Sequence, residues 1–202
     1  MILNYPTFFK TRPIIKLQDP LQKFLGTFQD GVIEFNYLEI TKNAGHSCPD
    51  VTGAYLMTYR ALKALYNDEE LPVRGEIEVA FNKDYTDDIT SVMADVTSHI
   101  TGATLKLGFR GVEGKFSRIE KLKFNETFEG NIRFKRLDNQ KEVIAKYDLS
   151  SIPIDAKQDI LMSKVLSGEA TLNEEIDFEV LWQQRVEKIF NHASEVITII
   201  KG

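Results

Sequence analysis

The residue types most capable of chemistry in this sequence lie around its single cysteine, Cys48. One serine separates Cys48 from His46, and the pair stands in "GHSCP", where a glycine-containing loop leads into an expected helix. Zinc accepts thiolate sulfur and imidazole nitrogen, whereas magnesium and calcium prefer oxygen ligands. The pair therefore predicts a site for one divalent metal ion, zinc, with Cys48 bound as the thiolate.

Two further candidate ligands lie downstream. Asp95 and His99 stand at an i, i+4 spacing in "DDITSVMADVTSHI", a segment predicted to be helical, so both side chains project from one face. With His46 and Cys48 they could form a tetrahedral shell, or three ligands and a position open to water. Zinc lowers the pKa of a bound water to about 7. Cys48 and Asp95 are accordingly the candidate catalytic residues, with Asp95 as a ligand, an orienting group or a general base.

Two other interpretations of the Cys48 loop stay open. The start of a helix stabilises a thiolate, so Cys48 could be a nucleophile with His46 as its base. Asp50, just inside the same helix, opposes thiolate formation, and metal binding is therefore favoured over covalent catalysis. The second alternative is a buried structural cysteine beside a hydrogen-bonded histidine. His192, in the expected C-terminal helix, is interpreted as a surface or packing residue.

The composition of the 202-residue chain excludes several classes of protein. The formal net charge is -5 and the basic residues are scattered, so we expect no nucleic-acid partner. A single cysteine excludes an intramolecular disulfide and a multi-cysteine zinc finger. The N-terminus has no basic region ahead of a sustained apolar run, and no apolar run reaches the length of a membrane span. We expect a soluble, cytoplasmic protein with no membrane partner.

The elements that must position these side chains are grouped by type along the chain. Helices are predicted over 19–28, 49–65, 87–100, 156–168 and 173–193. Strands are predicted over 31–41, 74–82, 115–124, 131–137 and 142–149, with 195–202 as a short strand or an ordered tail. Such grouping favours an α+β fold over a doubly wound parallel sheet. We expect one domain, with an α+β core over 1–150 and a C-terminal helical extension over 151–202. In this core a mixed, mostly antiparallel sheet packs against the helix after Cys48, which is apolar around most of its circumference.

Two segments together resemble the FmdE-like family of formylmethanofuran dehydrogenase proteins. The segment "GHSCPDVTGAYLMTYRALKAL" is similar to the family's Gly-His-x-Cys-Pro signature and the helix after it. The segment "ADVTSHITGATLKLGF" is similar to its second signature, with matches at Asp95, Thr101, Gly102 and Thr104. The resemblance spans residues 28–109 well and the remainder in general layout.

The chain departs from the family pattern at several positions. Ala103 and Val92 stand where the family commonly has cysteine, and Asp50 replaces a glycine. Many members carry a C-terminal cysteine-rich zinc finger, which is missing here because no cysteine follows Cys48. We therefore expect weaker zinc binding than in members with a full set of ligands.

The resemblance has implications for fold, assembly and function. It implies an α+β core, a homodimer, and a metal site reduced to His46, Cys48 and Asp95, with His99 as a local substitute. It implies a zinc-binding protein, either a metalloenzyme acting on an unidentified small molecule in C1 or related metabolism, or a non-catalytic accessory or metal-handling protein. The family name refers to an operon and not to a reaction of this chain.

Overall fold

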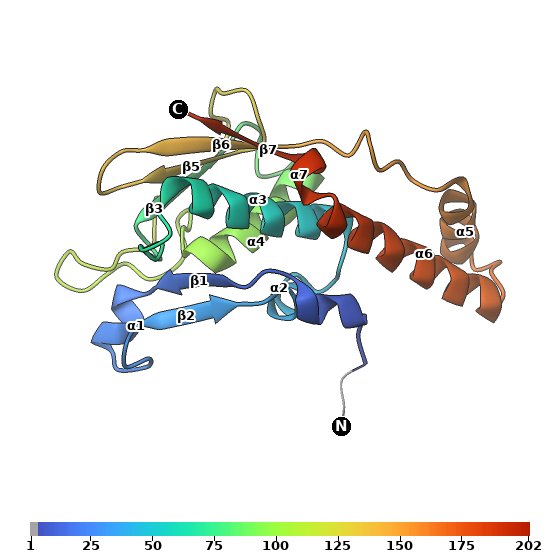
Figure 1. Ribbon diagram of the computed structural model, residues 1–202, viewed down its shortest axis with the longest axis horizontal. Helices are drawn as coiled ribbons and strands as arrows, with labels where there is room; N and C mark the ends of the chain where they lie inside the picture. Colours follow the sequence, from blue (N-terminus) through green and yellow to red (C-terminus); the bar gives the residue numbers. More distant parts are fainter. Residues whose placement is uncertain (1–3) are drawn as a thin grey trace.

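The computed structural model, which describes residues 4–202, is organised around helix α3 (Pro49–Leu65) (Figure 1). Apolar side chains lie on nearly every side of this helix, and Val51, Ala54 and Tyr55 are fully buried. A helix that is apolar all round must be covered by other elements on every side. The expectation of a buried central helix is confirmed.

A five-stranded sheet covers one side of α3. In spatial order its strands are β4 (Leu122–Lys123), β3 (Ile77–Phe81), β5 (Ile132–Arg136), β6 (Glu142–Tyr147) and β7 (Ile197–Lys201). Neighbouring strands are antiparallel except β3 and β4, which are parallel. Ile77 and Val79 of β3 and Phe134 of β5 are completely buried, because alternate residues of each strand face the helices. The α+β fold with a mixed, mostly antiparallel sheet is confirmed.

A smaller sheet lies on the opposite side of α3 (Figure 1). This side holds the short 3-10 helix η1 (Thr7–Thr11), β1 (Ile15–Gln18), α1 (Pro20–Phe24) and β2 (Val32–Phe35). Helix α4 (Asp88–Thr101) lies beside α3, between the two sheets (Figure 1). The two strands pair antiparallel. The Tyr55 hydroxyl of α3 reaches the Phe35 carbonyl of β2 at 3.1 Å. The helices α3 and α4 therefore form a middle layer between two sheets.

The C-terminal part forms an arm and then returns to the large sheet. Its elements are α5 (Ala156–Ser167), α6 (Leu172–Asn191), the short α7 (Ala193–Val196) and β7. Val186, Ile189 and Phe190 are buried in the core, whereas α5 and the first half of α6 project from the body as a helical pair (Figure 1). Among residues 4–202, no helix is both long and apolar enough to cross a membrane.

The predicted strand over 31–41 is wrong in its second half. Strand β2 ends at Phe35, and the chain turns directly into helix α2 (Tyr37–Ala44). Asn36 accepts a hydrogen bond from the Glu39 amide, and the Glu39 carboxylate accepts one from the Asn36 amide, so a complete capping box starts the helix. This local pairing prevails over the alternation of apolar residues. The His46–Cys48 loop therefore follows a helix and not a strand.

Two other predicted elements are much shorter than expected. Of the strand over 115–124, only Leu122–Lys123 pairs with a neighbour. Phe116 and Glu120 have φ values of 64° and 63°, which lie in the left-handed region and interrupt an extended chain. The helix over 19–28 ends at Phe24 and is followed by turns.

Candidate site at the start of helix α3

The loop between α2 and α3 holds Cys48 in a defined position. Gly45 ends α2 with a φ of 77°, a conformation that glycine adopts without steric cost. Cys48 is the N-cap residue of α3, and its Sγ accepts a 3.4 Å hydrogen bond from the Val51 amide. Pro49 occupies the first helical position, where its missing N–H costs nothing. The sulfur atom thus sits where a serine or threonine oxygen commonly lies.

The surroundings of Cys48 keep its sulfur protonated. The side chain is buried, with 7% of its surface exposed. Burial raises the pKa of the Cys48 thiol, the amides of Val51 and Asp50 lower it, and the Asp50 carboxylate raises it further. A raised thiol pKa disfavours a nucleophilic cysteine at neutral pH. A bound metal ion would displace this proton.

His46 has the opposite environment, because its side chain is exposed. Its Nδ1 lies 2.9 Å from the carbonyl oxygen of Ala44. A carbonyl oxygen only accepts hydrogen bonds, so Nδ1 carries the proton in this contact, and in the neutral ring Nε2 holds the free lone pair. Metal-binding histidines usually have one ring nitrogen donating to a carbonyl or carboxylate in this way.

Asp50 lies near both residues of the motif. It is partly buried in the first turn of α3. Burial raises the pKa of the Asp50 carboxyl, whereas the charges of Arg185 and His46 lower it. This carboxylate therefore raises the pKa of the Cys48 thiol. The sequence alone indicates only that it opposes thiolate formation.

A network of hydroxyl groups fixes the loop from inside. The Tyr37 hydroxyl lies 2.7 Å from Thr52 Oγ1 and 3.0 Å from Ser47 Oγ. Thr52 Oγ1 in turn donates to the Cys48 carbonyl at 2.8 Å. Tyr37 and Thr52 are fully buried, and burial raises the pKa of Tyr37 to about 12. The position of the loop is therefore determined by α2 as well as by α3.

Helix α6 and strand β6 hold the same loop from outside. Trp182 Nε1 donates to the Ser47 carbonyl at 2.8 Å, and Tyr147 donates to the Pro49 carbonyl at 2.8 Å. A Cβ atom at Gly53 would lie 2.5 Å from a ring carbon of Tyr147, so only glycine permits this approach. Sequence reasoning missed these residues, although Trp182 is the only tryptophan of the chain. No local pattern connects them to a loop about a hundred residues or more away.

Asp95 and His99 share one face of α4, but that face packs against α2 and β2. Asn43 Nδ2 donates to Asp95 Oδ2 at 3.0 Å, near the end of α2. The His99 ring meets the Phe35 ring edge to face, with centroids 5.2 Å apart. Burial and the charge of Arg74 lower the pKa of His99. Across residues 4–202, no three His, Cys, Asp or Glu side chains form a group that could hold a metal ion.

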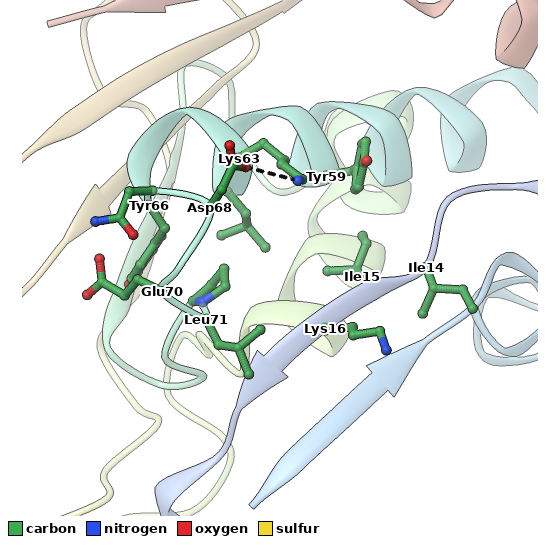
Figure 2. A pocket seen from close by; sticks show the side chains of 12 residues that line it. Ile14, Ile15, Lys16, Tyr59, Lys63, Tyr66, Asp68, Glu70 and Leu71 are labelled. Atoms are coloured by element: carbon green, nitrogen blue, oxygen red, sulfur yellow. Dashed lines mark hydrogen bonds and ion pairs between the residues drawn. The ribbon is translucent and has the colours of Figure 1, made fainter.

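Two hollows lie near opposite ends of α3. An open groove beside the loop is lined by His46, Ser47 and residues of η1, α2 and α6. At the other end of α3 a smaller cavity of about 290 Å³ lies between Tyr59 and Leu62 of the helix, its C-cap residue Tyr66, and Ile15 of β1 (Figure 2). No histidine or cysteine lines this second cavity. Of the two candidate ligands in the loop, His46 lines the groove, whereas the buried Cys48 lines neither hollow.

The fold and the site together define an α+β protein with a His-x-Cys loop at the start of its central buried helix. The family model "FmdE, Molybdenum formylmethanofuran dehydrogenase operon" matches residues 44–198. The chain therefore belongs to the FmdE family, and the resemblance noted in the sequence is confirmed. The match begins immediately before the His-x-Cys motif and extends into β7. No match was found among curated proteins.

Proposed function

We propose that this protein binds one divalent metal ion, zinc, at the start of α3, with His46 and Cys48 as its ligands. The observation that carries the proposal is the contact of His46 Nδ1 with the Ala44 carbonyl, which leaves Nε2 free to bind a metal. The sulfur of Cys48 lies two residues away at a helix start. Burial raises the pKa of this thiol and the amides of Val51 and Asp50 offset part of the rise, so a bound metal ion would have to displace the proton. Nitrogen and sulfur donors of this kind suit zinc.

Two protein donors do not complete a zinc site. The remaining positions are assigned to water, to a small molecule in the groove, or to a residue of a second copy. Zinc with a bound water supplies a hydroxide near neutral pH. The partly buried Asp50 carboxylate would offset part of the positive charge of the ion. Because the Cys48 proton must leave, binding should tighten as the pH rises.

Asp95 is assigned an indirect role. Its carboxylate holds Asn43, which stands three residues before His46 at the end of α2. Loss of Asp95 would release the end of α2 and thereby loosen the loop. Asp95 is therefore proposed as a positioning residue, and His99, which faces Phe35, as a packing residue.

An accessory or metal-handling role fits this geometry better than a metalloenzyme. His46 is exposed at the edge of an open groove, and a site of this kind can receive and release an ion. A metalloenzyme acting on a small molecule is the second candidate, because the groove beside His46 is large enough to hold a small molecule. Binding of a small molecule only to the metal-loaded protein would select the second candidate.

Homodimerisation through the arm is proposed as well. Leu172, Ile176 and Val180 form an i, i+4, i+8 stripe on the projecting half of α6, and all three are exposed. An apolar stripe on a projecting helix matches the way in which amphipathic helices pair. Sedimentation at micromolar concentration should give a dimer, and Ile176→Glu should give a monomer. A monomer for the unsubstituted chain would reject the dimer.

Metal analysis of the tag-free protein tests the metal site. Zinc should be bound by the unsubstituted chain and lost in Cys48→Ser and in His46→Ala. His192→Ala is a matched control, because His192 is also exposed and its Nδ1 also contacts a backbone carbonyl, that of Lys188 at 2.9 Å. It has no cysteine beside it and should retain the metal. Full zinc occupancy in both loop variants would reject the site.

A further inference from the structure

One end of the molecule exposes large apolar side chains from two segments that are distant in sequence. They come from α1 with its following turn and from the loop between α4 and β4: Phe24, Leu25, Phe28, Leu105, Leu107 and Phe109. Leu107 is 85% exposed and Phe24 is 61% exposed. Single exposed apolar residues are normal, but a group of them marks a surface that is covered in use.

The two segments are held side by side. The rings of Phe24 and Phe116 stack with their centroids 5.2 Å apart. Beneath them, the fully buried Asp19 caps α1 and accepts a 2.7 Å hydrogen bond from Arg118, near the end of the loop. In Figure 1, α1 and the yellow-green loop lie at the end of the molecule opposite the α5–α6 arm. A buried ion pair is costly to break, so the fold keeps these segments together.

Basic side chains are interleaved with the apolar ones. Lys23, Lys106, Arg110 and Lys115 are exposed, and within the described part of the chain none of them forms an ion pair. Asp30, Glu113 and Glu120 are the exposed acidic side chains on the same segments. Residues 19–31 and 102–121 together hold six basic and four acidic side chains and so carry a net charge of +2, although the chain as a whole has a net charge of -5. We call this surface of α1, its following turn and the loop the apolar–basic face.

We propose that the apolar–basic face docks onto an anionic lipid surface. Exposed apolar side chains enter the boundary between headgroups and acyl chains, and lysine or arginine beside them binds the anionic headgroups. Leu107 and Phe24 would insert into this boundary, and Lys106 and Arg110 would bind the anionic headgroups. The contact is peripheral and spans no part of the bilayer.

A second copy of the chain fits the same face less well. A symmetric contact places the same patch of both copies face to face. Two faces with a net positive charge would then repel each other, because the four unpaired basic side chains on each face outnumber its three exposed acidic side chains. An anionic lipid surface causes no such repulsion and attracts all four basic side chains.

Flotation of the protein with lipid vesicles tests the proposal. Vesicles of equal parts phosphatidylcholine and phosphatidylglycerol should bind the protein at low salt, and vesicles of phosphatidylcholine alone should bind it much less. The double substitution Lys106→Gln, Arg110→Gln should weaken binding about 30-fold, from roughly 1 kcal/mol for each basic residue near a charged membrane. Leu107→Ser should also weaken it, and high salt should release the protein.

Matched variants elsewhere on the surface provide the controls. Leu166 of α5 is 80% exposed, so Leu166→Ser removes a similar apolar side chain from the opposite end. Lys141→Gln with Lys201→Gln removes two exposed charges outside the face. Both control variants should bind vesicles like the unsubstituted chain. Absence of binding to anionic vesicles, or equal losses in control and face variants, would overturn the proposal. Self-association that Leu107→Ser abolishes, without vesicle binding, would also overturn it in favour of a second copy.

Discussion

The start of α3 and the contact between α2 and α4 both carry titratable side chains, but the fold uses them differently. At the start of α3, His46 Nδ1 contacts the Ala44 carbonyl, and the Cys48 sulfur lies against the backbone amides of the helix start. At α4, Asp95 binds Asn43, and His99 packs on Phe35. The first region therefore leaves an exposed imidazole beside an open groove, whereas the side chains of the second region contact neighbouring elements.

The difference follows from where each region lies on its helix. A helix start exposes amides that have no partner within the helix, so side chains and ligands can bind there. The middle of a helix face has no such free groups, and its side chains meet the neighbouring element. Residues of the same chemical type thus acquire different roles. Three predictions test this comparison, in order of decreasing effect.

Substitution of Leu62 by aspartate should have the largest effect, because both regions depend on a buried α3. Leu62 is 2% exposed and lies in the core. An unpaired carboxylate there costs several kcal/mol, comparable to the total stability of a domain. We expect no cooperative thermal unfolding by circular dichroism. Lys63→Gln, at the exposed neighbouring position, should melt like the unsubstituted chain. A soluble, cooperatively melting Leu62→Asp protein would contradict the buried position of α3.

Removal of one hydrogen bond in each region should lower the free energy of unfolding by different amounts, both smaller than the effect of Leu62→Asp. Tyr37→Phe deletes a buried hydroxyl that contacts Thr52 and Ser47, and should lower the free energy of unfolding by about 1–3 kcal/mol. Asn43→Ala deletes the exposed contact to Asp95 and should cost less than about 0.5 kcal/mol. Urea unfolding measures both values. Equal costs would show that the two regions are held equally firmly.

Titration of His99 should give the smallest effect. Burial and Arg74 lower its pKa in the folded protein, so the unfolded chain binds the proton more readily. The stabilisation linked to neutral His99 is fully present above about pH 6.5, the pKa of histidine in the unfolded chain. It is lost as the pH falls from that value toward the lower pKa of His99 in the folded protein.

Replacement of this histidine isolates its part of the pH dependence. His99→Gln should reduce the loss of stability between neutral and mildly acidic pH, measured by urea unfolding at several pH values. His192→Gln serves as the control, because it removes an exposed histidine that lies outside the contact with Phe35. If His99→Gln leaves the pH dependence of stability unaltered, the packed contact of His99 with Phe35 is contradicted.

Much of the fold could be predicted from local patterns. The helix after Cys48, the helix that starts after Asp87 and ends at Gly102, and the antiparallel pair β5–β6 all lie where local patterns predict them. Periodicity and capping residues act over a few positions, so one sequence suffices to detect them. The prediction for 31–41 failed because its alternation suited a strand, while Asn36 and Glu39 formed a capping box.

The sequence by itself determined the chemical inventory: a His-x-Cys loop at a helix start, an Asp and a His on one helix face, and the family to which the chain belongs. Only the tertiary structure decided how these groups are used. It turned the α4 face toward α2, buried the Cys48 sulfur, and brought Trp182 and Tyr147 to the loop. The physical reason is that pKa values, exposure and free lone pairs depend on neighbours distant in sequence. Those neighbours are selected by packing of the whole chain, which no short segment encodes.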